Sequence, residues 1–558
     1  MTIGRMVKEE KEARKAAATK AVTNYMGGTS YGVTPVEAMK MATASSIFGE
    51  PQYYRDGEYA ESGVRDGFMR VNSIFLPFSI FEPAPSEERT SQFMERLIDD
   101  ALSYDFGETI RWARTLRSEY GMRLNPQVIM VRAASHPNRV AFNEENPGVF
   151  SEIEAAVMSR ADEPAVQLAY FLHENGSKAA IPNVLKRGWA RRLSGMSRYE
   201  AAKWKNGAVG MIDVVRLCHA KGEVVDELMR TGNVTVGESE RTWENMRSAG
   251  ASWREILDAI RIPHMALLRN LRGIFSEVDD EETARKVLDA LKAGVKSGRQ
   301  FPFRYMSAMN AVEASDANFK TMILDALEDC ADLACDNLPR LKGRTMCLSD
   351  NSGSAWGTFN SEYGTVTVAE IDNLSAVIAA RNSDEGFVGK FGDDLKTFPI
   401  LKRNGILTQA KAISKNRYGD VGGATEAGIW KFLDEAIRKK EKWDNVIVFS
   451  DMQAGHGGLY GDPATMRKAR AAGDVCRNGS YVDVAKMIDR YRKAVNPKVN
   501  VLCVQTAGYD DVVVPEYGYR TCLAYGWTGK EVAFADAMSR LWDEADAARE
   551  NCGAKSGT

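Results

Sequence analysis

The spacing of apolar residues changes once along this chain of 558 residues, near Leu341. Between Ser91 and Asp336 apolar residues recur at helical spacing, and short turns rich in Gly, Pro or Asn separate the segments. Successive antiparallel helices of this length usually stack as a solenoid, although no repeat of fixed period is visible here. Residues 1–340 are therefore predicted to form an all-α domain, in which Phe301–Leu333 is helical throughout.

Beyond Leu341 short apolar runs alternate with helical stretches. The runs are Thr345–Leu348, Val446–Phe449, Val499–Val504 and Arg520–Ala524, and the helical stretches are Val366–Arg381, Thr425–Lys439, Tyr481–Ala494 and Glu531–Arg549. Alternation of strand and helix predicts a mostly parallel sheet that is covered on both faces. Residues 341–558 are therefore expected to form a doubly wound α/β domain, so the fold class is α followed by α/β.

The composition is that of a soluble globular protein, with 44% hydrophobic and 27% charged residues. A net charge of −3 argues against a surface coated with nucleic-acid-binding charge, but it allows a local basic face. Eight cysteines without a CxxC pair indicate reduced thiols in a cytoplasmic protein. The chain has no window of about eighteen apolar residues and no signal-like N-terminus, so we expect no membrane association.

Hydroxyl and carboxylate side chains follow two of the predicted strands. Asp350, Ser352 and Ser354 come just after the first strand, and Asp451 comes directly after the run that ends at Phe449. In an open α/β sheet such strand ends line the ligand crevice, and hard oxygen ligands suit Mg²⁺. A turn or a helix N-cap would also explain the first motif. The second aspartate favours a divalent-metal site, with Mg²⁺ or Mn²⁺.

The Asp-x-Ser-x-Ser pattern resembles the metal-ion-dependent adhesion site of von Willebrand factor A domains. The resemblance implies a threonine from a second loop, which Thr425 supplies, and an aspartate from a third loop, which is Asp451. Ala424 separates Thr425 from the glycine pair, where the related proteins place threonine next to the glycines. A metal with open positions could activate water. Because the motif contains no histidine or lysine base, we expect no enzyme, and metal-dependent hydrolysis is the alternative.

Basic residues are concentrated in two stretches of the helical part. Between 178 and 205 they are Lys178, Lys186, Arg187, Arg191, Arg192, Arg198, Lys203 and Lys205, with Glu200 as the one acid. A second stretch contains Arg111, Arg114, Arg117, Arg123, Arg132 and Arg139, with Glu119 as the one acid. In the first stretch the charges flank an apolar stripe that is expected to pack, so they should face water. Such a face can neutralise phosphates, although solubility alone would also explain it.

Five segments of the helical part occur in an order that resembles the TROVE module of the Ro ribonucleoprotein autoantigen family and its bacterial relatives. They are Gly121–Val128, Ile181–Arg187, Lys203–Lys205, Asp213–His219 and Met265–Leu271. The resemblance covers roughly Thr29–Arg340, and a von Willebrand A-like domain follows in that family too. It implies a ring of HEAT-like repeats closed by the A-type domain. The outer basic surface would bind Y RNA, a small structured noncoding RNA, and the central hole would accept single-stranded ends of defective RNA.

The same resemblance implies particular RNA contacts and partners. The family's RNA-contacting lysine falls on Lys203 and its histidine on His219, whereas a following arginine has no counterpart, and Lys205 could take its role. A helix C-cap is the alternative for His219. We expect a monomeric, non-catalytic RNA-binding scaffold that can act as an adaptor to an exoribonuclease. A metal-dependent protein-binding adaptor without RNA is the alternative.

Overall fold

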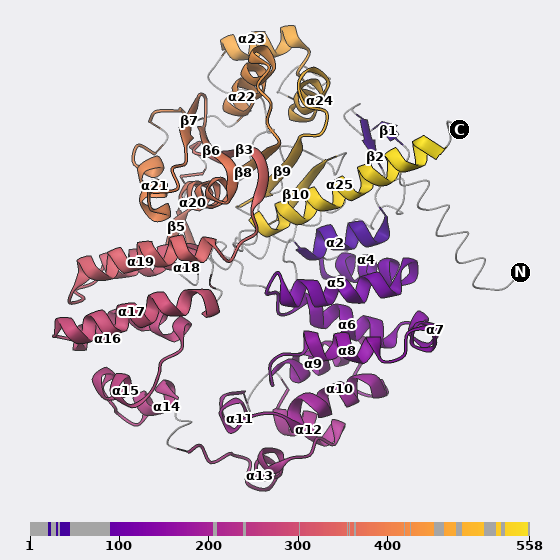
Figure 1. Ribbon diagram of the computed structural model, residues 1–558, viewed down its shortest axis with the longest axis vertical. Coiled ribbons are helices and arrows are strands. Elements are labelled where there is room, and N and C mark those ends of the chain that lie inside the picture. The colour runs from indigo at the N-terminus through magenta and orange to yellow at the C-terminus, as the bar shows by residue number, and fades with distance from the viewer. Residues whose placement is uncertain are drawn as a thin grey trace, which may run out of the picture. The chain divides into compact units, whose positions relative to one another are not determined.

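The computed structural model describes most of the chain from Thr90 onwards and a few shorter segments before it (Figure 1). The described residues are 21–23, 29–31, 34–44, 90–204, 209–237, 242–298, 300, 302–353, 355–356, 358–361, 364–417, 419–423, 426–450, 463–475, 483–506, 520–525 and 531–555. The chain divides into two compact units. One comprises residues 38–50 and 94–262, and the other comprises 1–37, 51–93 and 263–558.

The unit of residues 38–50 and 94–262 is helical. Its helices are α2 (Pro35–Ala44), α4 (Thr90–Tyr104), α5 (Phe106–Ser118), α6 (Asn125–Ser135), α7 (Asn138–Glu145), α8 (Val149–Val157), α9 (Glu163–Asn175), α10 (Asn183–Ser194), α11 (Arg198–Trp204), α12 (Met211–Cys218), α13 (Glu223–Thr231), α14 (Trp243–Ser248) and α15 (Trp253–Ala259). Helix α5 packs on α6 and α8, and α10 packs on α8, α9 and α12. Phe150, Leu168 and Trp189 are buried between them. The helical spacing of the sequence therefore reflects a real apolar core.

The other unit contains a small antiparallel pair, β1 (Ala21–Thr23) and β2 (Thr29–Tyr31), so the prediction that residues 1–340 are all-α is wrong at this pair. Four helices of this unit precede the large sheet. They are α16 (His264–Glu277), α17 (Glu281–Gly298), α18 (Pro302–Glu313) and α19 (Lys320–Cys335). The prediction of one helix over Phe301–Leu333 is wrong, because a turn separates α18 from α19. Asn318 in this turn donates from its backbone N–H to the Phe275 carbonyl at 2.9 Å and from its side chain to the Val278 carbonyl at 3.0 Å. Contacts with α16 thus fix a break that local spacing does not show.

A six-stranded sheet follows in the order β10-β9-β8-β3-β6-β7. Its strands are β3 (Leu341–Asp350), β6 (Ser383–Phe391), β7 (Leu395–Pro399), β8 (Asn445–Ser450), β9 (Asn500–Gln505) and β10 (Thr521–Tyr525). All neighbours are parallel except β7, which pairs with β6 in antiparallel fashion. A separate hairpin consists of β4 (Thr358–Ser361) and β5 (Gly364–Thr367). The sequence did not predict β1, β2, β4, β5, β6 or β7.

Helices cover both faces of this sheet (Figure 1). They are α20 (Val368–Arg381), α21 (Ile406–Ser414), α22 (Glu426–Lys439), α23 (Pro463–Ala472), α24 (Val484–Ala494) and α25 (Glu531–Lys555). Helices α20 and α25 contact each other and the strands, while α22 packs on α24. The predicted fold class, helices followed by a doubly wound α/β domain, is confirmed. No helix among the described residues is both long and apolar enough to cross a membrane.

The compact units do not divide at the predicted domain boundary of 340/341. Helices α16 to α19 group with the sheet, because α19 packs on α21 and α18 packs on α20. The secondary structure itself changes from helix to strand between Cys335 and Leu341. The boundary of two folding domains at 340/341 stays a prediction.

Candidate nucleic-acid interface and metal centre

Helix α10 carries the first predicted basic stretch on a firmly packed scaffold. Leu185, Trp189 and Leu193 lie on its buried side. The Trp189 Nε1–H donates to the Gln167 side-chain oxygen on α9 at 2.7 Å, and the Gln167 amide donates to Gln127 on α6 at 2.8 Å. The apolar stripe and this hydrogen-bond chain fix the orientation of α10, and hence the direction of its charged side.

The cations at the beginning of this stretch are available. Lys178 and Arg187 are exposed and Lys186 is half-buried. Within the described part of the chain, none of the three takes part in an ion pair or a side-chain hydrogen bond. Arg191 is also exposed and donates to the Ser151 carbonyl at 3.2 Å. These four cations lie on α10 or just before it, and no described carboxylate neutralises Lys178, Lys186 or Arg187.

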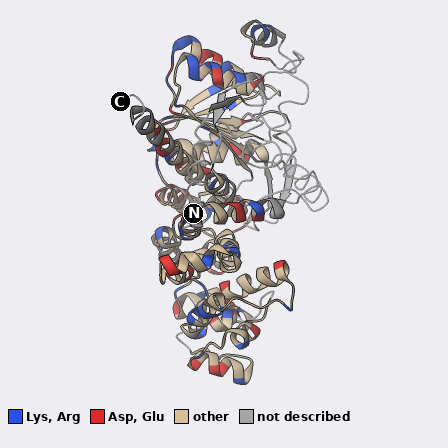
Figure 2. Cartoon of the chain, turned by 90° about the vertical axis from the view of Figure 1, so that its right-hand side faces the viewer, with Lys and Arg blue, Asp and Glu red and all other residues tan. Residues whose placement is uncertain are grey.

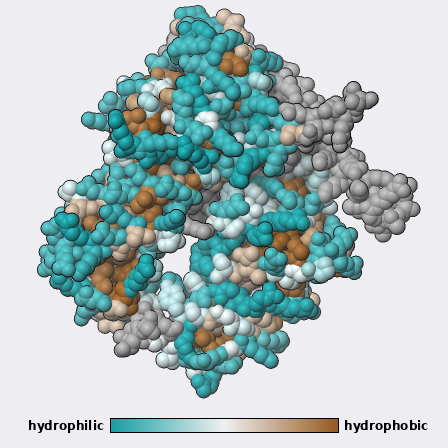
Figure 3. Space-filling view, in the orientation of Figure 1, coloured by the Kyte–Doolittle hydropathy of each residue, from teal (hydrophilic) through white to brown (hydrophobic). Residues whose placement is uncertain are grey.

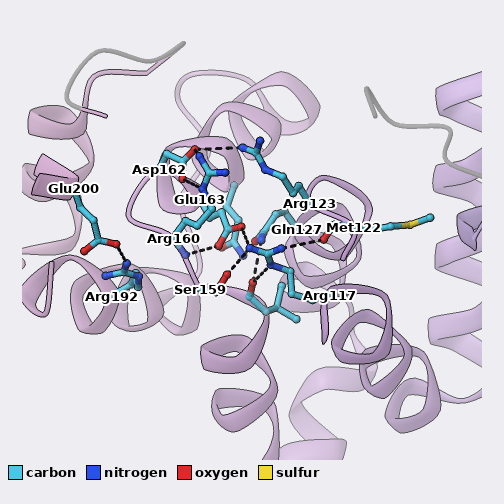
Figure 4. Close-up of polar contacts among 12 residues, drawn as sticks. Arg117, Met122, Arg123, Gln127, Ser159, Arg160, Asp162, Glu163, Arg192 and Glu200 are labelled. Atoms are coloured by element: carbon cyan, nitrogen blue, oxygen red, sulfur yellow. Dashed lines mark hydrogen bonds and ion pairs between the residues drawn. The ribbon is translucent and has the colours of Figure 1, made fainter. Parts of the chain in front are cut away.

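The later cations of the stretch are paired. Arg192 forms an ion pair with Glu200 (Figure 4), and Arg198 pairs with both Glu223 and Glu227. Lys203 lies 3.8 Å from Glu244 and its Nζ donates to the Tyr199 hydroxyl at 3.0 Å. The described residues therefore do not form a continuous cationic face over Lys178–Lys205. The open charge is concentrated at the amino-terminal end of α10.

The second basic stretch is bound largely to nearby carboxylates (Figure 4). Arg117 donates to Glu163 at 2.7 Å and to the Val157 carbonyl at 3.2 Å. Burial raises the pKa of Glu163, and the nearby Arg117 opposes that rise. Arg123 lies 3.4 Å from Asp162, but 53% of its side chain is exposed. Of these two arginines only Arg123 is well placed to reach a ligand.

Arg132 lies in a polar clamp between α4, α6 and α9. Its guanidinium contacts Asp99 at 2.5 Å, Glu174 at 3.0 Å and the Tyr170 hydroxyl at 2.9 Å. Burial is the largest single influence and lowers the pKa of Arg132, but the hydrogen bonds and negative charge of Asp99 and Tyr170 together outweigh burial and raise it. Since the side chains of Arg132 and Arg192 are only 18% and 17% exposed, these two predicted contact residues are poorly accessible. Basic and acidic residues also lie interspersed along the helices in Figure 2.

The two positions carried over from the family pattern differ in setting. His219 is the C-cap of α12 in the left-handed conformation, with φ 56°, and its N–H donates to the Val215 carbonyl at 2.9 Å. Its side chain is nevertheless exposed, so the cap and a ligand contact are compatible. Lys203 is exposed on α11 beside Tyr199 and Trp204. Lys205 lies outside the described residues.

The predicted metal loop begins where β3 ends. Asp350 is fully buried, and its carboxylate accepts from the Ser352 N–H at 2.8 Å and from the Ser450 hydroxyl at 2.5 Å. Ser450 is the last residue of β8, immediately before Asp451. The Gly353 N–H donates to the Gly423 carbonyl at 3.1 Å. The loop after β3, the end of β8 and the glycine loop before Thr425 therefore meet.

These contacts test only part of the predicted donor set. Asp350 and Ser352 are described, whereas Ser354, Thr425 and Asp451 lie outside the described residues. Among the described residues no three His, Cys, Asp or Glu side chains gather as metal ligands. A buried carboxylate beside serine hydroxyls fits a hard cation such as Mg²⁺. The hydrogen bond between Asp350 and Ser352 would also form in a simple turn, which is the alternative to a metal site.

Asp393, which the sequence did not single out, supports the glycine loop. Its carboxylate accepts from the Gly423 N–H at 2.8 Å, and its carbonyl accepts from Lys431 at 2.8 Å. Gly422 has φ 78°, and a Cβ there would lie 2.1 Å from the Asp393 carboxylate. The glycine is thus required by both conformation and space. The glycine pair in the sequence indicates a tight turn at this place. It does not indicate that Asp393 is the residue that the turn contacts.

The fold defines a protein with a helical N-terminal region followed by a mixed six-stranded α/β sheet. Residues 230–347 match the TROVE domain family. The crystal structure of the Ro (RSR) protein of Deinococcus radiodurans is similar with a TM-score of 0.57 and 14% sequence identity, over 80% of this chain and 93% of that chain. These matches confirm the predicted resemblance to a Ro homologue of the bacterial type. Of the five segments that carry the resemblance, only Met265–Leu271 lies within residues 230–347.

Proposed function

We propose that this Ro-type protein is an RNA-binding scaffold without catalytic activity. The observation that carries the proposal is the TROVE match together with the open cations Lys178, Lys186 and Arg187 at the start of α10. Lysine and arginine on a rigid helix bind phosphates and fix the RNA backbone without reading its sequence. A Y-type structured noncoding RNA is the proposed ligand of this surface.

Single-stranded ends of defective RNA are the second proposed ligand, in the central hole that the family resemblance implies. Such ends are recognised by strandedness and stacking rather than by base sequence. The protein would then act in RNA quality control, or as an adaptor that presents RNA to an exoribonuclease. A monomeric state and a cytoplasmic location belong to the same proposal.

The test of the α10 surface is a matched pair of double variants of the full chain. Lys186→Ala/Arg187→Ala removes two open cations, whereas Arg285→Ala/Lys286→Ala removes the same charge from α17, where both side chains pair with Glu281 and Glu282. In filter-binding titrations at several salt concentrations, the α10 variant is expected to weaken RNA binding about tenfold and to lower the salt slope by about 2. The α17 variant should bind as the wild type does. Equal affinity of all three proteins would reject this surface.

The metal part of the proposal concerns Asp350, Ser352, Ser354, Thr425 and Asp451, which would hold Mg²⁺ or Mn²⁺ at the carboxyl ends of the strands. It is supported by the contacts of the loop after β3 with the end of β8, through buried Asp350, and with the glycine loop, through Gly353. A bound cation there would offer an open position to a carboxylate of a partner. A protein partner that co-purifies without RNA and is lost with a chelator would favour the protein-adaptor function. Mg²⁺-dependent RNA turnover that Asp350→Ala abolishes would favour a hydrolase.

A further inference from the structure

Asn373, a residue of α20, forms hydrogen bonds with Asn351 in the predicted metal loop. We infer that Asn373 is a positioning residue for this loop and that it makes the carboxyl end of α21 part of the support of the metal site. The inference rests on the proposed metal site. It concerns how the loop is held, and it assigns no further ligand.

Asn351 stands between the predicted ligands Asp350 and Ser352, and Asn373 holds it through both ends of its amide. The Asn351 amide donates to the Asn373 oxygen at 2.9 Å, and the Asn373 amide donates back to the Asn351 oxygen at 3.1 Å. The Ser349 hydroxyl donates to the same Asn373 oxygen at 2.7 Å. Asn351 and Asn373 are both completely buried. Because a buried amide left without partners is costly, this exchange fixes the direction of the loop.

The second contact of Asn373 connects the loop to α21. The Asn373 amide donates to the Ser414 hydroxyl at 2.9 Å, and Ser414 is the last residue of α21. Next to it, the Ile413 carbonyl accepts from the Nζ of buried Lys390 at 3.0 Å. Lys390 also contacts Asp420 at 2.8 Å, in the segment that leads to Gly422 and Gly423. The end of α21 therefore contacts Asn373, which holds the loop after β3, and Lys390, which contacts the segment before the glycine loop. These are two of the three predicted metal-binding segments.

This arrangement predicts a specific effect on metal affinity. Hydrogen-bond partners that orient metal ligands typically change the affinity for the ion by about 10–100-fold when they are removed. The Asn351 amide nitrogen also donates to the Ser349 carbonyl at 3.2 Å, but loss of the Asn373 side chain would remove its second acceptor and the donor to its oxygen. A polar network that merely stabilised the fold would change the free energy of unfolding and leave the affinity of the folded protein for metal unaltered.

The experiment measures Mn²⁺ binding to the full chain by electron paramagnetic resonance, using Asn373→Ala and Asn382→Ala. Asn382 is the C-cap of the same helix, and its side chain contacts the Ile378 carbonyl at 3.0 Å and Cys335 of α19 rather than the metal loop. Asn373→Ala is expected to weaken Mn²⁺ binding about tenfold or more, with Asn382→Ala close to wild type. If the wild type itself binds no Mn²⁺, the proposed metal site is wrong. If the wild type binds and Asn373→Ala binds equally well, the positioning role is wrong.

Hydrogen exchange of the wild type gives an answer even if Asn373→Ala does not fold. Mn²⁺ is expected to slow amide exchange at residues 350–353 and also at residues 411–414, the last turn of α21. Slower exchange confined to residues 350–353 would overturn the link to α21. Slower exchange in both segments would support it.

Discussion

The carboxylate of Glu328 on α19 accepts two hydrogen bonds from Thr408 on α21, one from the backbone N–H at 3.0 Å and one from the hydroxyl at 2.7 Å. Its other oxygen accepts from the Leu407 N–H at 2.7 Å, and Asp332 accepts from the Ile406 N–H at 3.1 Å. Two carboxylates of α19, which lies within the residues that match the TROVE domain family, thus cap the first turn of α21. A Cβ at Gly405 would lie 2.3 Å from Glu328, so the glycine permits this close approach.

Removing this cap should loosen the attachment of α19 to the sheet domain. Glu328→Ala leaves the N–H groups of the first turn of α21 without their carboxylate, and a loss of about 2 kcal/mol in the free energy of unfolding is expected. Urea denaturation measures it. Glu282→Ala on α17, which removes an exposed i,i+4 pair with Lys286, should change stability by less than about 0.5 kcal/mol. Equal effects of the two substitutions would contradict the capping role.

Glu154 on α8 predicts a pH-dependent stability. Its side chain is buried against Gly188 of α10, and burial raises the pKa of its carboxyl from 4.5 to about 7, against opposing contributions from Gln167 and Arg191. The folded protein then keeps this proton between those pH values, whereas the unfolded chain loses it. This contribution to stability is therefore complete below pH 4.5 and is lost as pH rises to about 7.

Glu154→Gln should remove that dependence and stabilise the protein above pH 7 by up to about 3 kcal/mol, with little gain below pH 4.5. Thermal unfolding across this range is the measurement. Glu152→Gln on the same helix is the control, because Glu152 is exposed and 3.8 Å from Arg114. A gain for Glu154→Gln that does not vary with pH would contradict the assignment.

Arg520 should anchor α25 to the sheet. Its buried guanidinium contacts Asp543 and Asp546 of α25 at 2.6 Å and the Asn500 side chain at 2.7 Å. Arg520→Leu leaves Asp546 buried without this partner and should cost about 3 kcal/mol, with faster hydrogen exchange along α25. Arg285→Leu on α17 removes an i,i+4 pair with Glu281 in which both side chains are more than half exposed, and it should be nearly neutral. Unchanged exchange in α25 of Arg520→Leu would reject the anchor.

The sequence predicted the change from helices to an α/β sheet because apolar spacing is a local property. Strand β6 was not predicted because Gly386, Gly389 and Lys390 interrupt its apolar pattern. It forms a strand because it pairs with β3. The tight fit explains the glycine, since a Cβ at Gly386 would lie 1.9 Å from the Ala380 carbonyl oxygen. Packing between distant segments is what local spacing cannot express.

In the candidate sites, too, the sequence predicted local features but not contacts between distant segments. The amphipathic pattern of α10 correctly placed Trp189 inside and Arg187 outside. Counting charges could not show that Arg132 is held by Asp99 and Glu174, which lie 33 and 42 residues away along the chain. Most of the face seen in Figure 3 is hydrophilic, so a hydrophilic surface alone does not distinguish the proposed RNA-binding cations either.

The most direct test of the central claim is the affinity of the wild-type protein for a structured noncoding RNA with a single-stranded 3′ tail, measured over a series of salt concentrations. We predict binding at about 50 mM salt that weakens steeply by about 200 mM, with a linear dependence of log affinity on log salt. No binding at the lowest salt concentration, or an affinity that does not respond to salt, would contradict an RNA-binding scaffold.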